Sequence, residues 1–205
     1  MMLTNANPLT HTPVILQPPG AGVPFLERFF GGIGIRISAM LSTPEQCNQN
    51  FHRAFLHMLE LIHMTPQTEW TRPVLVPRFQ GLEDSSRYWS ICMVLNHLNQ
   101  VNLGTLKNIQ HLVQEQKPNM TVRIEDVKPP VIQETLQATQ VLQTFKEACE
   151  TYLQEMTPLA GKLKTHTTLA HPWFGELNAH QWHFMMGFHM QLHGKQVQAI
   201  VNGLT

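Results

Sequence analysis

Hydrophobic side chains recur at steps of three and four residues over four long stretches of the chain, which is the spacing of one face of an α-helix. In the first stretch the repeated positions are Phe51, Phe55, Met58 and Ile62. The pattern predicts helices over about 44–62, 86–116, 131–156 and 179–203. Almost no segment alternates between apolar and polar residues as a half-buried strand does. We therefore expect an all-α protein.

Four amphipathic helices of this length favour a four-helix bundle. The connection between the second and third helices is about fifteen residues long, which exceeds what an antiparallel pair needs. It allows these two helices to run in the same direction, which gives an up-down-down-up order. We divide the chain into an irregular N-terminal arm, rich in proline, over residues 1–41 and a bundle domain over 42–205. The arm can wrap either its own bundle or a partner.

Charge and cysteine content narrow the classes of function. The formal net charge is 0 and no basic or acidic block is present, so we expect neither a nucleic acid nor a membrane as partner. The three cysteines, Cys47, Cys92 and Cys149, are odd in number and widely spaced. They are typical of reduced thiols in a cytoplasmic protein, and no signal peptide is apparent.

Two histidines on the last predicted helix are the strongest candidates for chemistry. His189 and His193 are four residues apart, so their side chains lie on one helical face. That face also carries Trp182 and Ile200, which indicates that it is buried. Two imidazoles at this spacing can share one metal ion, or they can be core histidines satisfied by hydrogen bonds. His97, on the second predicted helix, can supply a third ligand across the bundle.

The remaining histidines form no pair at ligand spacing. We expect His180 and His183, which flank Trp182, to lie toward solvent. A di-iron carboxylate bundle needs two Glu-x-x-His motifs on different helices, and only Glu60 and His63 fit one. The sequence therefore disfavours a di-iron carboxylate site.

The chain resembles the DinB-like (damage-inducible) four-helix bundle proteins. The resemblance is carried by Trp89–Leu98, by His171–Gly175, and by Trp182 together with the His189, His193 and Gln196 pattern. The family places one metal-binding histidine on the second helix and two on the fourth. By resemblance, His97, His189 and His193 are the ligands of a divalent metal, zinc or nickel, that keeps open positions.

The resemblance also bears on activity. Some family members resemble S-transferases that use a low-molecular-weight thiol such as bacillithiol, mycothiol or glutathione, and maleylpyruvate isomerase is a relative. It implies a small-molecule substrate or thiol as partner. Gln196, one turn beyond His193, can hydrogen-bond a ligand imidazole or a substrate, or it can be a polar residue at the end of the bundle.

Two function classes stay open: a metal-dependent thiol transferase or isomerase, and a non-catalytic, stress-related bundle that binds a metal or small ligand. We also expect a homodimer, because the apolar side of the second helix is broader than one core face. The residues behind that expectation are Leu95, Leu98, Ile109 and Leu112.

Overall fold

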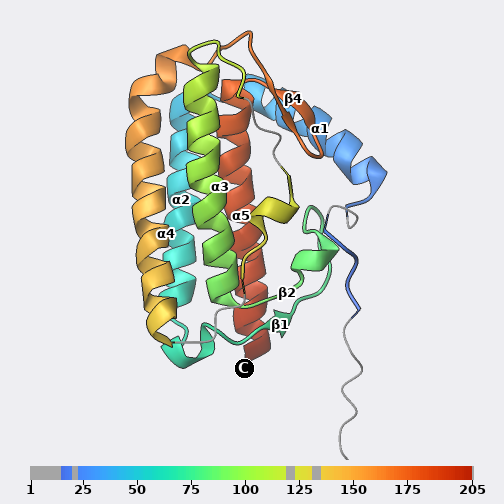
Figure 1. The fold of residues 1–205 in the computed structure, drawn as a ribbon, viewed down its shortest axis with the longest axis vertical. Coiled ribbons are helices and arrows are strands. Elements are labelled where there is room, and N and C mark those ends of the chain that lie inside the picture. The colour runs from blue at the N-terminus through green and yellow to red at the C-terminus, as the bar shows by residue number, and fades with distance from the viewer. Residues whose placement is uncertain (1–14, 20–22, 119–122, 131–134, 205) are drawn as a thin grey trace, which may run out of the picture.

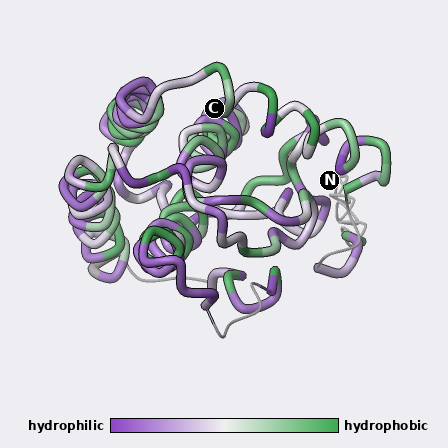
Figure 2. Tube along the Cα trace, turned by 90° about the horizontal axis from the view of Figure 1, so that it is seen from above, coloured by the Kyte–Doolittle hydropathy of each residue, from purple (hydrophilic) through white to green (hydrophobic). Residues whose placement is uncertain are grey.

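Four long helices form the body of the protein in the computed structural model, which describes residues 15–19, 23–118, 123–130 and 135–204. The helices pack side by side as a bundle (Figure 1), and Figure 2 views them end-on. They are α2 (Pro44–His63), α3 (Ile91–Leu112), α4 (Thr135–Met156) and α5 (Ala179–Leu204). The prediction of an all-α, four-helix bundle is confirmed. The first four residues of the third predicted helix, 131–134, lie outside the described residues.

Local side-chain chemistry fixes the starts of two of these helices. Thr43 caps α2 by accepting a hydrogen bond from the backbone of Gln46, whose side chain bonds back to the backbone of Thr43. Asn178 and Gln181 form the same reciprocal pair before α5. Each pair satisfies amide groups that have no partner inside the helix, which is why both starts follow from the sequence.

The start of α3 lies five residues after the predicted one. Asp84–Ser86 forms a short 3₁₀ helix, η2, and Tyr88–Trp89 forms a strand, β2, which pairs antiparallel with β1 (Val74–Leu75). Ser90 then caps α3 by accepting a hydrogen bond from the backbone of Met93. The strand pairing uses the backbone groups of 88–89, so the helix cannot begin before Ser90.

Part of the predicted irregular arm is helical. Residues Phe25–Met40 form α1, so the prediction of an irregular arm is wrong there, while residues 1–14 and 20–22 lie outside the described residues. The helix packs against α5 and against a hairpin of β3 (Leu169–His171) and β4 (Gly175–Leu177). A Cβ at Gly32 would lie 3.3 Å from the carbonyl oxygen of Phe174. The close approach favours glycine here, although it weakens a helix by roughly 1 kcal/mol.

Three further short 3₁₀ helices connect these elements: η1 (Gln67–Glu69), η3 (Glu125–Val127) and η4 (Thr157–Lys162). The core lies between the long helices and contains the apolar stripes that the sequence indicated. Phe51 and Met58 of α2 and Phe145 and Cys149 of α4 have no exposed surface. Among the described helices, none combines the length and the apolar character that crossing a membrane requires.

Candidate metal centre

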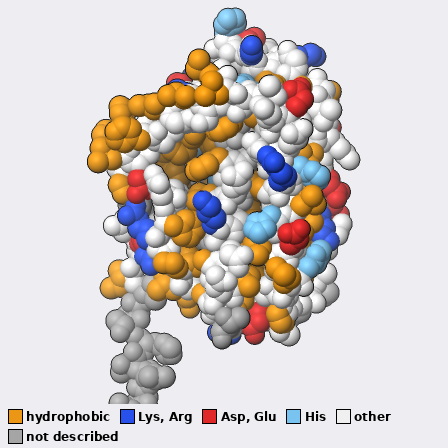
Figure 3. Space-filling view, turned by 180° about the vertical axis from the view of Figure 1, so that it is seen from behind, with side chains coloured by type: hydrophobic (Ala, Val, Ile, Leu, Met, Phe, Trp, Pro, Cys, Tyr) orange, Lys and Arg blue, Asp and Glu red, His pale blue; other side chains and the backbone are white. Residues whose placement is uncertain are grey.

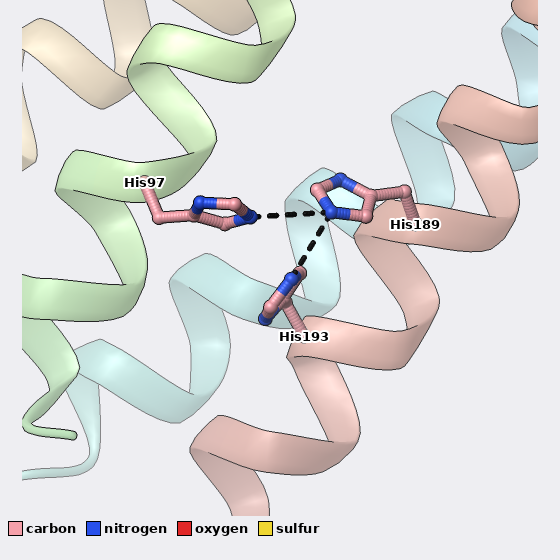
Figure 4. A group of neighbouring side chains, drawn as sticks. All are labelled: His97, His189 and His193. Atoms are coloured by element: carbon pink, nitrogen blue, oxygen red, sulfur yellow. Dashed lines mark hydrogen bonds between the residues drawn. The ribbon is translucent and has the colours of Figure 1, made fainter. Parts of the chain in front are cut away.

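Three imidazoles from two helices converge at one point of the core. His97 comes from α3, while His189 and His193 come from successive turns of α5 (Figure 4). The Nε2 atom of His189 lies 3.3 Å from Nε2 of His97 and 3.1 Å from Nε2 of His193. The structure therefore brings together the three residues that the sequence singled out, with one nitrogen of each ring facing the other two.

Backbone and amide oxygens set the orientation of two of these rings. His97 Nδ1 donates to the carbonyl oxygen of Val127, at 2.7 Å. His193 Nδ1 donates to Oε1 of Gln196, also at 2.7 Å. The amide of Gln196 in turn donates to the carbonyl oxygen of Ser86. Because those oxygens can only accept, both Nδ1 atoms carry the proton, and both Nε2 atoms present a lone pair toward the centre.

Hydrogen bonding alone cannot satisfy this arrangement. His97 and His193 each offer a lone pair at Nε2, and His189 can donate one proton to only one of them. The other lone pair would then stay buried without a donor, which is costly in a protein core. A cation at the centre would accept all three lone pairs, so the donor set fits a metal ion.

The spacing of the nitrogens also fits. Ligand nitrogens about 2.0–2.1 Å from one tetrahedral zinc ion lie roughly 3.3 Å apart. The two separations to Nε2 of His189, 3.1 and 3.3 Å, agree with that value, and all three ligand atoms lie within 4.8 Å of one another. Three histidines complete only part of a metal's coordination shell, which distinguishes this set from a closed structural site.

Burial keeps the imidazoles neutral. It lowers the pKa of His97 to about 4 and that of His193 to about 3. The pKa of His189 is held well below its usual range by burial and by the neighbouring His193 and His97. Neutral imidazole is the form that binds a metal, so the site does not need to release protons at neutral pH.

An aromatic ring and an ammonium group lie beside the cluster. The indole of Trp89 is nearly parallel to the ring of His193, with an interplanar angle of 6° and centroids 6.2 Å apart. Lys128 Nζ lies 5.2 Å from the centroid of Trp89 and 2.6 Å from a carboxylate oxygen of Glu83. A paired cation therefore stands over the outer side of the indole.

We expected His180 and His183 to lie toward solvent, and the structure places neither of them fully there. His183 is buried, contrary to expectation: its Nδ1 accepts from the hydroxyl of Tyr152 at 2.9 Å, and its Nε2 donates to the carbonyl oxygen of Pro44. His180 is half-buried against the carbonyl oxygens of Ala39 and Ser42. The reason is that α5 packs against α1, α2 and α3, so few of its faces are left for solvent.

The residues that orient the cluster were only partly visible in the sequence. Gln196 was a candidate, and it bonds a cluster imidazole as one of its two expected roles requires. The carbonyl groups of Val127 and Ser86 were missed, as was Lys128. No sequence signal marks a backbone carbonyl, because every residue has one.

Comparison with known proteins supports the fold. No protein-family model matches the chain, and no curated protein matches it. Among solved structures the chain is similar to TT2238, a four-helix bundle protein, with a TM-score of 0.54 and 21% identity. The match covers 77% of this chain and 99% of that one. At this identity the likeness shows a shared four-helix bundle and nothing about activity.

Proposed function

We propose that this protein binds a divalent metal, zinc or nickel, through His97, His189 and His193. The observation that carries the proposal is the convergence of three Nε2 atoms, two of them with lone pairs fixed by hydrogen bonds at the opposite ring nitrogen. Such a centre, when loaded, lowers the pKa of a thiol or water that binds it.

We further propose that the chain is a DinB-like protein whose helices follow an up-down-down-up order. Two contacts support that order. Gln67, just after α2, bonds to Thr139 near the start of α4, which supports antiparallel helices. Gln110, near the end of α3, donates to Glu155, near the end of α4, which supports parallel helices.

In this proposal, the protein's own groups bind the metal and orient its ligands. Val127 and Gln196 hold His97 and His193 in the tautomer that leaves Nε2 bare. Trp89 covers one side of the cluster and excludes water from it. His189 is half-buried, and its Nδ1 has no hydrogen-bond partner among the residues that the structure describes. The ring of His189 is the least buried of the three, although its Nδ1 atom is itself buried, so we expect a small ligand to approach the cluster past this ring.

The reaction class that we propose is transfer or isomerisation with a low-molecular-weight thiol in the cytoplasm. The three cysteines are all buried and free, which supports a reducing compartment. The second candidate is non-catalytic metal or small-ligand binding. It is favoured by the absence of any carboxylate, among the described side chains, in hydrogen-bond contact with the three imidazoles.

Elemental analysis of the purified protein, followed by thiol titration, tests both proposals. We expect close to one equivalent of metal per chain. In the cobalt-substituted protein, a thiol that binds the metal produces a sulfur-to-cobalt charge-transfer band. A band that saturates with glutathione or cysteine favours the thiol reaction. Metal without any such band favours the non-catalytic alternative, and no metal after reloading contradicts both.

A further inference from the structure

The outer face of α1 is apolar although it faces solvent. Three phenylalanines begin it: Phe25, Phe29 and Phe30, of which Phe25 is 74% exposed and Phe30 64%. Ile33 and Ile37 continue the face along the helix. Figure 3 shows hydrophobic side chains gathered into a ridge where this helix lies. We call this surface the α1 outer face.

The α1 outer face is also broad. Leu26, Met40 and Leu41 lie on the same side, and Met40 is 82% exposed. At 100° per residue, the exposed apolar positions of α1 fall within one arc of about 160°. The helix buries the opposite side, which carries Gly32, Ile35 and Ala39. A surface helix in a monomer is expected to have its apolar side inward, whereas α1 is apolar toward solvent as well.

The charged residues of α1 are already engaged within the chain. Glu27 pairs with Arg78 at 2.9 Å. The side chain of Arg28 donates to the carbonyl oxygen of Val23, and that of Arg36 to the carbonyl oxygen of Phe174. Arg28 and Arg36 keep their positive charge, but both guanidinium groups are held by carbonyl oxygens of this chain at the edge of the α1 outer face.

We propose that the α1 outer face binds the same face of a second copy of this chain, with the two helices antiparallel about a two-fold axis near Ile33. Such an axis requires a patch that is complementary to itself, and a mainly apolar stripe satisfies that condition. Ile33 lies at the middle of Phe25–Met40, so antiparallel copies centred there overlap along the whole helix.

The area of the face suits a stable dimer. A large apolar side chain buries roughly 150–200 Å² when fully covered, so the exposed parts of these residues sum to about 800–1,000 Å². A standard interface buries about 800 Å² on each partner. A groove of about 380 Å³ between α1 and the hairpin, lined in part by Phe29, Trp173 and Phe174, extends the face and can receive a side chain of the second copy.

A lipid surface fits the face less well. Helices that lie in a membrane interface carry many lysines and arginines on their polar side, which attract anionic headgroups. The α1 helix has only two arginines and one glutamate, they do not share one side of the helix, and each is held by an intramolecular contact. The attraction to a lipid surface would therefore come mainly from apolar burial, which a second copy supplies equally well.

Sedimentation of the full chain tests the proposal. We expect a mass of twice 23.4 kDa at tens of micromolar protein. The double variant Phe30→Asp/Ile37→Asp should sediment as a monomer at the same concentration, with a dissociation constant at least tenfold higher. The control is Leu56→Asp/Leu103→Asp, which places two charges on other exposed apolar positions, on α2 and α3. It should stay dimeric.

Three results overturn the proposal. One is a wild-type monomer at tens of micromolar. A second is a dimer that persists in Phe30→Asp/Ile37→Asp, because the interface then lies elsewhere. A third is a wild-type monomer that co-floats with phosphatidylcholine–phosphatidylglycerol vesicles through α1, which would make a lipid surface the partner. Circular dichroism checks that each variant keeps its helices. None of these results depends on metal binding.

Discussion

Lys128 Nζ lies 2.6 Å from the carboxylate of Glu83, and this ion pair joins the two segments that orient the histidine cluster. Lys128 follows Val127, whose carbonyl oxygen accepts from His97. Glu83 precedes Ser86, whose carbonyl oxygen accepts from Gln196. Lys128 also donates to the hydroxyls of Ser85 and Ser86. The ammonium group of Lys128 thus connects the two segments whose carbonyl oxygens orient the cluster.

Replacing that ammonium should weaken metal binding without touching a ligand. We expect Lys128→Met to lower the affinity for zinc by about tenfold, at the low end of the effect of removing a group that orders metal ligands. Lys128→Arg, which keeps the charge, should restore most of it. Competition against a chelator with known zinc affinity measures the change.

In that experiment, a loss of protein stability has to be distinguished from a loss of orientation of the metal ligands. Breaking a buried ion pair from one side costs about 3–5 kcal/mol, whereas removing both charges costs less. The double variant Lys128→Met/Glu83→Gln should therefore regain stability yet keep the weakened affinity. A double variant with wild-type affinity would show that Lys128 acts on stability alone.

His193→Ala should abolish most metal binding while the bundle stays folded. The residue supplies one of three ligands, and the bundle has a large core of apolar residues from all four long helices. The control is His57→Ala on α2, whose side chain is largely exposed. Metal content after chelation and reloading gives the measurement, with circular dichroism for helix content. Equal metal in both variants would refute the site.

Tyr152→Phe should destabilise the protein by about 1–3 kcal/mol, because it leaves a buried acceptor without a donor. The Tyr152 hydroxyl is the group that donates to Nδ1 of His183. The control is Tyr88→Phe, since Tyr88 is 46% exposed and its hydroxyl has water as an alternative partner. Urea denaturation measures both. A cost no larger than the control's would mean that this hydrogen bond contributes little.

Acid should destabilise the metal-free protein, starting well above the pH at which carboxylates titrate. The folded pKa is about 4 for His97 and His183 and about 3 for His193, against about 6.5 in an unfolded chain. Between those values the unfolded chain binds more protons, so stability is full above pH 6.5 and falls as the pH drops toward 4. The slope is at most about 1.4 kcal/mol per pH unit for each histidine.

Urea titrations of the chelator-treated protein at pH 7.5, 6.0 and 5.0 measure that slope. His183 is not a cluster residue, so His183→Asn should reduce the slope without changing metal content. A free energy of unfolding that stays constant or rises from pH 7.5 to 5.0 would contradict the burial of these imidazoles.

Periodicity predicted the bundle because the buried face of each long helix is marked by apolar residues at helical spacing. It did not predict α1, since Phe29 and Ile33 lie on an exposed side and the same spacing cannot say which face is covered. The residues behind the homodimer expectation offer no surface to a partner, because Leu95 and Leu98 of α3 are fully buried inside the bundle. The apolar surface that remains exposed lies mainly on α1.

The sequence predicted some residues of the candidate site better than others. Spacing alone paired His189 with His193, because both are on one helix. His97 was a candidate because it lies on a second long helix, and the family resemblance strengthened it, since nothing in spacing relates residues on α3 and α5. The carbonyl oxygens of Val127 and Ser86 are positioned by the conformations of two loops. Those conformations depend on tertiary contacts such as the ion pair of Lys128 with Glu83, which the sequence does not reveal.

The distance along the chain between His97 and His189 has a mechanical consequence. The two residues are 92 positions apart, and they lie on helices that contact each other in the folded bundle. An ion held by both would act as a removable cross-link around a loop of that length. A permanent link of this size stabilises a protein by about 4–5 kcal/mol in the chain-entropy description. Metal supply would then control the stability of the folded bundle as well as what the protein binds.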